Sequence, residues 1–600
     1  MNELNGKQLY GAFSAGGMAI IEAREELNRL NVFPVPDGDM GSNLAFTAKS
    51  IIEQAEIFAE AGKTMGSIAA AALKGARGNS GILFAQFING MSDMIQDRKS
   101  LPLAQFTEAV RSGTEAAYSA ISNPVEGTML TIMKDFASAL REKADADYRT
   151  ALEYGKKAVS KSLQKTKNQL EALKKAGVID AGAKGILAFI EGFLGYVASG
   201  APVSEETEIQ RAKVVFTGNA EHHAEIDAEE DLTFRYCTEG YISGENIDQK
   251  AIREKVMNYG DSLIVAGSSR NVRLHIHTDH PDVVFDVLKE HGQIQEEKVD
   301  DMHRQYQMVH ARKSEIALAV DSTCTIPEAF LDEHQIYQVP LMLNIGEMQY
   351  LDGVSIKPET FFRRMTKISE PIQTSQPNIA TFSKLFDHLT SHYTSVISVS
   401  LTSGQSGTYN SAVQAAAGFQ GVKLSTVDSK ENGIGLGLLV QTAAREIEAG
   451  LSHDQIVENI ALNRQRVETF VLVPTLKYLI RGGRVPALKG FIGRLMNVKG
   501  IIGLDGEGKA YTRDKAYSMK QAHQKLLDSV AGLHRERRIE RFAISHANAL
   551  DSARSLADAI TNETGVRVEY IESMSPVLGA HGGPGSLNLA LITEKPPREN

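Results

Sequence analysis

The spacing of apolar residues changes twice along this chain of 600 residues and divides it into three parts. In residues 1–200, apolar side chains recur every three or four positions, as Ile20, Ala23, Leu27 and Leu30 do. Alanine-rich runs such as GSIAAAALKGA add helix propensity, and strand-like alternation is scarce. These patterns predict an all-α helical bundle.

The second part follows a polar, proline-containing stretch, ASGAPVSEETEIQ at 198–210, which is typical of a linker. Beyond it, DLTFRYCTEGYI and NVRLHIHTDHP alternate like half-buried strands, with helical segments between them. We therefore expect a small α+β domain over residues 211–312.

The third part, residues 314–597, alternates short apolar runs with helix-like segments. EIALAVDS, SVISVSLTSG and VKLSTVDS each end in hydroxyl, acidic or glycine residues, and a helical pattern follows each of them. This alternation predicts a parallel α/β sheet, in which ligands bind at the carboxyl ends of the strands.

Composition and net charge argue against several classes of protein. The net charge of −10 argues against a nucleic-acid partner, because such proteins need a basic surface. The two cysteines, Cys237 and Cys324, give no disulfide framework, which fits a reducing compartment. No signal peptide is visible, and no apolar run approaches the roughly 18 residues that span a bilayer. We expect a cytoplasmic protein that is not integral to the membrane, with transient membrane contact left open.

The stretch NVFPVPDGDMGSN places Asp37 and Asp39 one glycine apart on a loop that two prolines keep out of a helix. Two carboxylates so close repel one another, and a cation between them removes that cost. Oxygen ligands on a short loop suit Mg²⁺, which proteins commonly hold with one or two carboxylates, phosphate and water. The alternative is a solvated acidic turn.

Two glycine-rich turns precede apolar helices in the same part of the chain. GARGNSGILFAQF occupies 75–87, and VIDAGAKGILAFI occupies 178–190. Backbone N–H groups at such helix starts bind phosphate. Helix capping is the alternative for either turn alone, whereas the two turns together with the acidic loop, on one helical domain, favour a phosphate ligand.

A further stretch, GLDGEGKA at 503–510, nearly matches the P-loop pattern, but Ala510 replaces the metal-binding Ser or Thr. Its flanks, KGIIGL and KAYTRDKAY, are typical of strands. We therefore expect a hairpin here and no nucleotide site.

The motifs NVFPVPDGDMGSN, GARGNSG, NPVEGTML and DAGAKG together resemble the nucleotide-binding domain (DAK2 or DhaL type) of dihydroxyacetone kinases and bacterial fatty acid kinases. The FPVPDGD form is similar to the fatty acid kinase branch. The resemblance implies a cup-like helical barrel that binds ATP with Mg²⁺, with Asp37 and Asp39 as catalytic metal ligands. It implies a nucleotide pocket lined by Asn43, Asn79, Ser80, Gly127, Thr128 and Asp180.

Two positions depart from the family pattern. Asn31 stands near the place where dihydroxyacetone kinases carry a third acid, and Met40 replaces the Thr of the usual DGDTG. The first departure leaves open whether a two-metal set assembles. The second removes one hydroxyl contact and could weaken activity.

In the middle part, HIHTDHP places His275 and His277 on one face of a strand, because strand side chains alternate with period two. With Cys237 as a third ligand, this set matches a catalytic-type zinc site with an open fourth position. The alternative is two ordinary strand histidines and a buried thiol. The segment also resembles the middle domain of fatty acid kinases, whose Cys and His-x-His pattern it matches.

Four stretches of the third part place hydroxyls, an Arg or a His next to glycine, and such groups can collect a carboxylate. They are TSQP (374–377), LTSGQSGTYNSA (401–412), LIRGGRV (479–485) and AHGGPGS (580–586). Each alone could be an ordinary connection at a strand end.

Together these stretches resemble the DegV family of fatty-acid-binding proteins, which implies a two-lobed α/β domain. By that resemblance Thr374 and Ser406 hold the carboxylate of a fatty acid. Ser375, Arg484 and His581 lie close to it. Burial of the acyl chain, at about 0.8 kcal/mol for each CH₂, would set affinity, and the hydroxyls would set orientation.

The three resemblances imply a fused fatty acid kinase. ATP would give its γ-phosphoryl group to the carboxylate of the bound fatty acid, and a downstream enzyme would accept the acyl phosphate, a role in phospholipid metabolism. We expect domain motion, or a homodimer in which one subunit's carrier serves the other's kinase. The alternatives are a fatty-acid-binding sensor with a weakened kinase, and a dihydroxyacetone-type kinase, whose separate substrate domain has no counterpart here.

Overall fold

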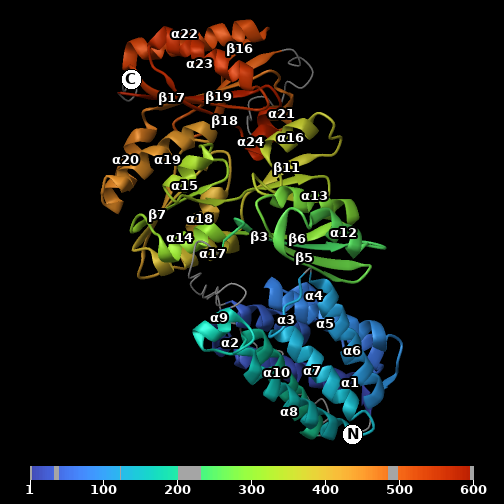
Figure 1. The fold of residues 1–600 in the computed structure, drawn as a ribbon. Coiled ribbons are helices and arrows are strands. Elements are labelled where there is room, and N and C mark those ends of the chain that lie inside the picture. The colour runs from blue at the N-terminus through green and yellow to red at the C-terminus, as the bar shows by residue number, and fades with distance from the viewer. Residues whose placement is uncertain (1–2, 33–38, 122, 200–231, 484–497, 595–600) are drawn as a thin grey trace. The chain divides into compact units, whose positions relative to one another are not determined.

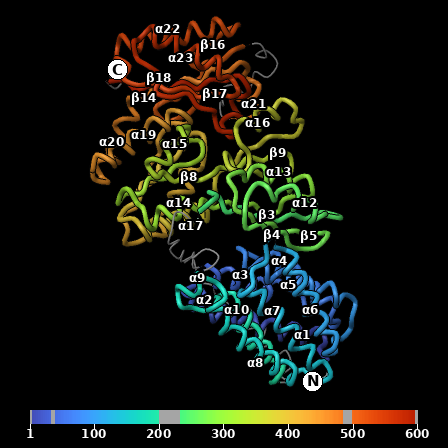
Figure 2. The backbone as a smooth tube through the Cα atoms, in the orientation of Figure 1, coloured from blue at the N-terminus to red at the C-terminus, as the bar shows by residue number. Residues whose placement is uncertain are grey.

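The computed structural model describes residues 3–32, 39–121, 123–199, 232–483 and 498–594. The chain divides into two compact units, Met1–Tyr306 and Gln307–Asn600, and Figures 1 and 2 trace both of them. The expected linker falls almost entirely outside the described residues. The domain limits 1–200, 211–312 and 314–597 therefore stay predictions.

The first unit begins with an all-helical region, as the apolar spacing predicts (Figure 1). A two-stranded antiparallel ribbon, β1 (Glu3–Asn5) and β2 (Ser100–Pro102), ties its start to the segment before α6. The helices are α1 (Gly6–Glu22), α2 (Arg24–Leu30), α3 (Met40–Gln54), α4 (Ala61–Gly75), α5 (Gly78–Ile95), α6 (Leu103–Ala120), α7 (Met129–Glu142), α8 (Tyr148–Thr166), α9 (Glu171–Ala176) and α10 (Ala181–Ser199).

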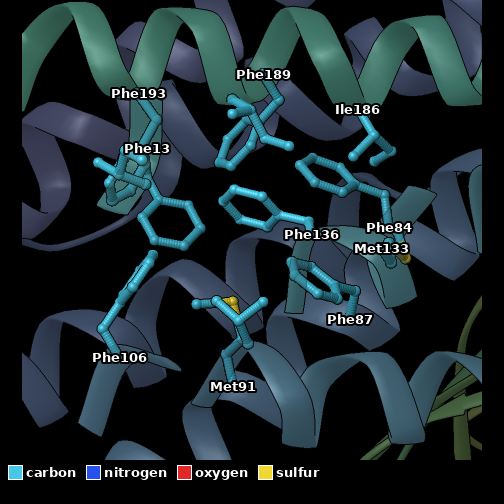
Figure 3. Close-up of a pocket in the computed structure, with 13 residues that line it drawn as sticks. Phe13, Phe84, Phe87, Met91, Phe106, Met133, Phe136, Ile186, Phe189 and Phe193 are labelled. Atoms are coloured by element: carbon cyan, nitrogen blue, oxygen red, sulfur yellow. The ribbon is translucent and has the colours of Figure 1, made fainter. Parts of the chain in front are cut away.

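Aromatic side chains fill the centre of this helical region (Figure 3). The ring of Phe13 meets the rings of Phe189 and Phe193 edge-on, with centroids 5.4 Å and 5.7 Å apart, and Phe84 meets Phe189 at 5.1 Å. Such edge-to-face pairs are favourable beyond the area they bury. The space left between the rings is about 20 Å³, roughly that of one water. The interior is therefore a packed core.

Helix α10 passes the length and composition test for a membrane span, alone among the helices of the described chain. The sequence did not predict this, because Lys184 and Glu191 interrupt the apolar run. In the structure 67% of the window is buried, and α10 carries Phe189 and Phe193 into the aromatic core. Its apolar character is that of a central core helix.

The middle region of the first unit is an antiparallel sheet in the order β4-β5-β3-β6, which confirms the α+β expectation. Its elements are β3 (Tyr236–Ser243), α12 (Gln249–Val256), β4 (Gly260–Gly267), β5 (Asn271–Thr278), α13 (Pro281–His291), β6 (Gln293–Asp301) and α14 (Met302–His310).

The alternation of side chains along these strands gives the sheet two different faces. Val272, Leu274 and Ile276 of β5 pack with the apolar side chains of α12 and α13. On the opposite face, Ile264 and Ala266 of β4 join the core of the helical region. One sheet therefore serves two cores, and the helical and middle regions pack as one unit.

Polar contacts along α5 reinforce this packing. Gln86 Oε1 accepts the N–H of Gly267 at 2.7 Å, and Asn89 Nδ2 donates to the carbonyl of the same glycine at 2.8 Å. At the start of α5, Arg77 pairs with Glu296 at 2.6 Å. Helix α5 is thus held against the middle sheet at two points along its length.

The second unit is an α/β structure. Its elements are β7 (Ile316–Asp321), α15 (Glu328–Glu333), β8 (Tyr337–Val339), β9 (Met342–Ile345), β10 (Met348–Leu351), α16 (Pro358–Met365), β11 (Ile372–Ser375), α17 (Ile379–His392), β12 (Ser395–Ser400), α18 (Thr408–Ala416), β13 (Lys423–Asp428), α19 (Gly433–Glu448), α20 (His453–Arg464), β14 (Val467–Val473), α21 (Lys477–Gly482), β15 (Lys499–Leu504), β16 (Ala510–Ala516), α22 (Met519–Arg537), β17 (Ile539–His546), α23 (Leu550–Thr564), β18 (Val568–Ser573), α24 (Pro576–Gly582) and β19 (Leu587–Thr593).

These strands form separate sheets in the second unit. The order β13-β12-β7-β8 is parallel throughout, which confirms the prediction made from its apolar runs. The order β16-β15-β14-β19-β17-β18 is antiparallel except between β17 and β18. The third sheet, β10-β9-β11, is antiparallel. Strand β11 carries Thr374 and Ser375 of the expected lipid site.

Candidate nucleotide, metal and lipid sites

A cavity of about 250 Å³ opens in the first unit beside the starts of α5, α7 and α10. Four residues expected to line a nucleotide pocket lie in its wall: Asn79, Ser80, Thr128 and Asp180. The remaining wall is mostly apolar and comprises Met40, Leu83, Ile121, Asn123, Val125, Met129, Leu130, Gly182, Ser262, Leu263 and Ile264. The volume lies slightly below the roughly 300–1,000 Å³ of typical small-molecule sites, so these walls suit part of a nucleotide.

Asp180 serves as a helix cap and also faces the cavity. Its Oδ1 accepts the N–H of Ala183 at 2.7 Å, and its own N–H donates to Thr166 Oγ1 at 3.1 Å. Burial raises the pKa of this carboxyl to about 7, although hydrogen bonds from the backbone of Ala183 and Met129 act in the opposite direction. Capping, the alternative for this turn, is therefore correct, and it coexists with the place of Asp180 in the cavity wall.

The glycine-rich turn at the start of α5 packs against Asn43. Gly78 has a φ of +55°, and a Cβ at this position would overlap the side-chain amide of Asn43. Asn43 therefore lies against the turn and is not part of the cavity wall. The next residue, Asn79, has a buried Oδ1 that accepts no hydrogen bond from the described residues. Such an oxygen can accept a hydrogen bond from a donor group on a ligand.

The turn before α7 is held by its own residues. Thr128 caps the helix and donates its hydroxyl to the carbonyl of Val125 at 2.8 Å. Gly127, at a φ of +88°, donates its N–H to Thr131 Oγ1 at 2.8 Å. Thr128 borders the cavity, whereas Gly127 supports the turn behind it.

The acidic loop is described only in part, because Asp37 lies outside the described residues. Asp39 occupies the cap position of α3, and its carbonyl accepts the N–H of Asn43 at 2.8 Å. Met40 follows it in the cavity wall, so the departure from the family's Thr falls at the site itself. The magnesium role of Asp37 and Asp39 stays a prediction.

The middle region also contributes to the cavity, which the sequence did not predict. Strand β4 has an irregular register between Asp261 and Ile264, and Ser262 adopts a φ of +53° there. Bulges of this kind re-aim side chains next to functional sites. The bulge places Ser262, Leu263 and Ile264 in the cavity wall. The segment DSLI carries no pattern that could have revealed it.

The predicted metal ligands come together on the middle sheet. Cys237 on β3 pairs in register with His277 on β5, and the ligand atoms of Cys237, His275 and His277 all lie within 4.8 Å of one another. Sγ of Cys237 is 3.8 Å from Nδ1 of His275. Asp261 Oδ1 lies 3.4 Å from Nδ1 of His277, in the manner of a carboxylate that orients a ligating imidazole. One sulfur and two imidazoles suit Zn²⁺ with a fourth position open.

Charges around this cluster come from two regions. Burial raises the pKa of the Cys237 thiol well above its usual range, and the carboxylates of Glu239, Asp300 and Asp39 add to the effect against the opposing charge of Lys298. The charge of Asp39, from the helical region, therefore acts on the same thiol as the charges of the middle sheet.

In the second unit, Thr374 and His581 are in contact, although 207 residues separate them in the sequence. Oγ1 of Thr374 at the end of β11 lies 2.9 Å from Nε2 of His581 in α24. Ser375, the next residue, is exposed. Arg484, the remaining residue expected near a bound carboxylate, lies outside the described residues.

The loop with Ser406 lies beside the same strand end. Oγ of Ser406 is 2.9 Å from Oγ1 of Thr408, which begins α18. Gln376, two residues after Thr374, donates to Ser411 Oγ at 3.1 Å, and its side chain occupies the space that a Cβ on Gly407 would fill. The structure thus brings the TSQP and LTSGQSGTYNSA stretches together.

The stretch 503–510 forms a hairpin, as predicted. Strands β15 and β16 pair antiparallel, and Asp505 Oδ1 accepts the N–H groups of Glu507 and Lys509 at 2.9 Å each. The carbonyl of Gly508 accepts the hydroxyl of Thr402 at 3.1 Å, so the hairpin turn packs on the loop that carries Ser406. Gly508 allows this close approach, because a Cβ there would overlap the Thr402 side chain.

Three family models match successive parts of the chain. A DAK2 domain model matches residues 34–195, a model of the FakA-like middle domain of fatty acid kinases matches 233–309, and the model of the DegV family of uncharacterised proteins matches 315–594.

Related sequences come from staphylococci. An uncharacterized protein of Staphylococcus epidermidis is 35% identical over 324 residues, which are 52% of this chain and 57% of the relative. An uncharacterized protein of Staphylococcus aureus is 33% identical over 328 residues, which are 53% of this chain and 59% of the relative. The chain thus spans somewhat more than half the length of these relatives.

Solved structures similar to the chain include DegV proteins. DegV of Bacillus subtilis, described as a fatty acid binding protein, is 29% identical with a TM-score of 0.43 and covers 47% of this chain and 100% of its own. A DegV family protein of Thermus thermophilus, also described with fatty acid binding, is 26% identical with a TM-score of 0.44 and covers 46% of this chain and 99% of its own. By the family models, this chain joins a DAK2 domain, a FakA-like fatty acid kinase middle domain and a DegV domain in one polypeptide.

Proposed function

We propose that this chain is an ATP-dependent fatty acid kinase that carries its own fatty-acid-binding domain. The DAK2 and middle domains would bind ATP, and the DegV domain would present a fatty acid whose carboxylate accepts the γ-phosphoryl group. The products would be ADP and an acyl phosphate. The observation that carries the proposal is the union of these three domains in one chain.

The cavity residues suit the nucleotide half of this reaction. Leu83, Leu130 and Ile264 offer an apolar surface to a base, and Asn79 offers a buried carbonyl oxygen to a donor on the nucleotide. The N-termini of the helices beside the cavity carry a positive partial charge and N–H groups, which favour the binding of phosphates. Together they would orient ATP and exclude water from it.

Asp37 and Asp39 would hold Mg²⁺, which supplies charge neutralisation between the phosphates and the approaching carboxylate. The acceptor needs no general base, because a fatty acid carboxyl with a pKa of about 4 is already ionised at neutral pH. The protein's task is then positioning. We also propose that Cys237, His275 and His277 hold Zn²⁺, to which the donor set is suited.

Thr374 and Ser406 would orient the carboxylate through their hydroxyls. His581, 2.9 Å from Thr374, would fix the direction of that hydroxyl. A tethered carrier can reach an effective concentration on the order of millimolar, provided that the connection lets it reach the nucleotide. Transfer could occur within one chain or between two copies in a dimer.

The test is ADP release by the full chain with MgATP, with and without oleate, and with Asp37→Ala and Asp39→Ala variants. We expect release that depends on oleate and is lost in both variants. Turnover with dihydroxyacetone in place of oleate would instead support a dihydroxyacetone-type kinase.

A second candidate function is a fatty-acid-binding sensor with a weakened kinase. Met40, which stands in the cavity wall where fatty acid kinases usually have Thr, favours it. In the same assay, tight binding of oleate without any ADP release would select this function over the kinase.

A further inference from the structure

Glu239 is a buried acid at the boundary between the middle sheet and the helical region. It lies on β3 with 2% of its surface exposed, and its carboxylate contacts the start of α5. An ionised carboxylate in such a place is strongly unfavourable unless it is paired and hydrogen-bonded. Its partners therefore indicate what the acid does.

Two cations and an imidazole surround this carboxylate at more than hydrogen-bond distance. Lys298 Nζ lies 3.6 Å from Oε1, Arg273 Nη2 lies 3.7 Å from Oε2, and Nδ1 of His275 lies 3.8 Å from Oε1. The hydrogen bond that Oε1 accepts comes from the backbone N–H of Gly78 at 3.2 Å, 161 residues away in sequence. Within the described residues Oε2 accepts none.

Gly78 is the first residue of α5, in the glycine-rich turn GARGNSG. The preceding residue, Arg77, makes no side-chain capping hydrogen bond to this helix. The first N–H groups of a helix have no partner within it, and a carboxylate there is favoured by the helix dipole. Glu239 thus supplies from the middle domain the cap that the helix's own sequence lacks.

The capped turn leads directly into the candidate nucleotide cavity. Asn79 and Ser80, the next two residues, lie in the cavity wall. Gly78 itself adopts a φ of +55°, against the side-chain amide of Asn43. A change in the position of the Gly78 N–H therefore moves both cavity residues.

We propose that Glu239 is a positioning residue that reaches from the middle domain to set the glycine-rich turn for nucleotide binding. The proposal rests on the proposed function, in that the cavity must bind a nucleotide. It gives the middle domain a defined part in that binding. The same side chain also lies beside His275. Glu239 therefore contacts both the candidate metal cluster and the glycine-rich turn.

Two substitutions distinguish the effect of the Glu239 side-chain length from the effect of its charge. Glu239→Asp keeps the negative charge for Arg273 and Lys298 but is too short to meet the N–H of Gly78. Glu239→Gln keeps the length and an acceptor oxygen but removes the charge. Asn89→Ala is the matched control, because it removes another buried hydrogen bond between the same two regions, well along α5, while Gln249 still satisfies the carbonyl of Gly267.

The measurement is the dissociation constant of Mg–ADP for the full chain by titration calorimetry, with thermal unfolding and zinc content as parallel readouts. We expect Glu239→Asp to weaken binding about tenfold or more, as the loss of a charge-assisted hydrogen bond predicts. Glu239→Gln and Asn89→Ala should stay within about threefold of the parent chain, because the turn keeps its acceptor in both.

The opposite pattern, with binding kept by Glu239→Asp and lost by Glu239→Gln, would overturn the proposal by assigning the effect to charge. Equal affinities in both variants, whether unchanged or reduced, would also overturn it. An equal loss in Asn89→Ala would mean that general docking of the domains matters and not the turn. If the parent chain itself bound no Mg–ADP, the proposed function would fall as well.

Discussion

Sγ of Cys237 lies 3.8 Å from Nδ1 of His275, on a strand pair whose register also brings His277 opposite Cys237. Tetrahedral zinc sites combine thiolate and imidazole ligands in this way. We therefore predict about one zinc per chain by mass spectrometry of the purified protein.

Cys237→Ser should remove most of that zinc. Cys324→Ala is the matched control, because Cys324 is buried in an apolar cluster of the second unit. Zinc retained by Cys237→Ser, or lost equally from both variants, would contradict the assignment.

The pairing of Thr374 with His581 predicts a carboxylate site in the second unit. Thr374→Val keeps the shape of the side chain but removes the hydroxyl, so oleate affinity should fall several-fold to tenfold, as expected for one hydrogen bond to an anion. Fluorescence displacement of a bound fatty acid probe measures this. Thr390→Val, whose hydroxyl donates to the local helix carbonyl of Asp387, should leave the affinity unchanged. Equal affinity in Thr374→Val and the parent would argue against this site.

Asp180 predicts a pH dependence of stability. Burial raises its pKa to about 7 from the ordinary 3.8, so the folded state holds the proton more tightly than the unfolded state does. Its contribution to the free energy of unfolding is fully present below about pH 4 and is lost as the pH rises to about 7. The full contribution of Asp180 to the free energy of unfolding is on the order of a few kcal/mol.

Asp180→Asn keeps an acceptor for the N–H of Ala183 but has no proton to lose. Urea unfolding at pH 5 and at pH 8 should therefore show a smaller loss of stability on going to pH 8 in this variant than in the parent. Parallel losses in the two proteins would show that Asp180 ionises normally.

Met40 offers a gain-of-function test. Met40→Thr restores the hydroxyl that fatty acid kinases usually carry at this point, in the wall of the cavity. One hydrogen bond contributes about 1 kcal/mol, so affinity for Mg–ADP should rise several-fold by titration calorimetry. Met40→Leu, which keeps the apolar bulk without a hydroxyl, should not improve binding. Weaker binding by Met40→Thr would mean that the thioether itself supports the site.

Local sequence patterns predicted much of the fold. The apolar period in 1–200 and the alternation in β3 and β5 correspond to the helical region and the middle sheet. The hairpin expected at 503–510 is also present, as the strand-like flanks predicted. These features depend on neighbours in sequence, which is why the sequence alone predicts them.

Contacts between distant segments were not predictable in this way. The bulge that brings Ser262 into the cavity wall has no composition signal, and neither does the hydrogen bond from Gly78 to Glu239. The glycine-rich turn was expected to offer free N–H groups, yet one of them is already bonded across the domain boundary. That partner follows from the packing of the middle sheet on α5, which one sequence does not encode locally.

The proposed kinase phosphorylates the carboxylate of a fatty acid. The most direct measurement is trapping of the product, in which the full chain is incubated with MgATP, oleate and hydroxylamine and the oleoyl hydroxamate is quantified by mass spectrometry. We predict hydroxamate that requires both ATP and oleate and disappears in Asp39→Ala. Absence of hydroxamate from a folded chain that binds both Mg–ADP and oleate would contradict it.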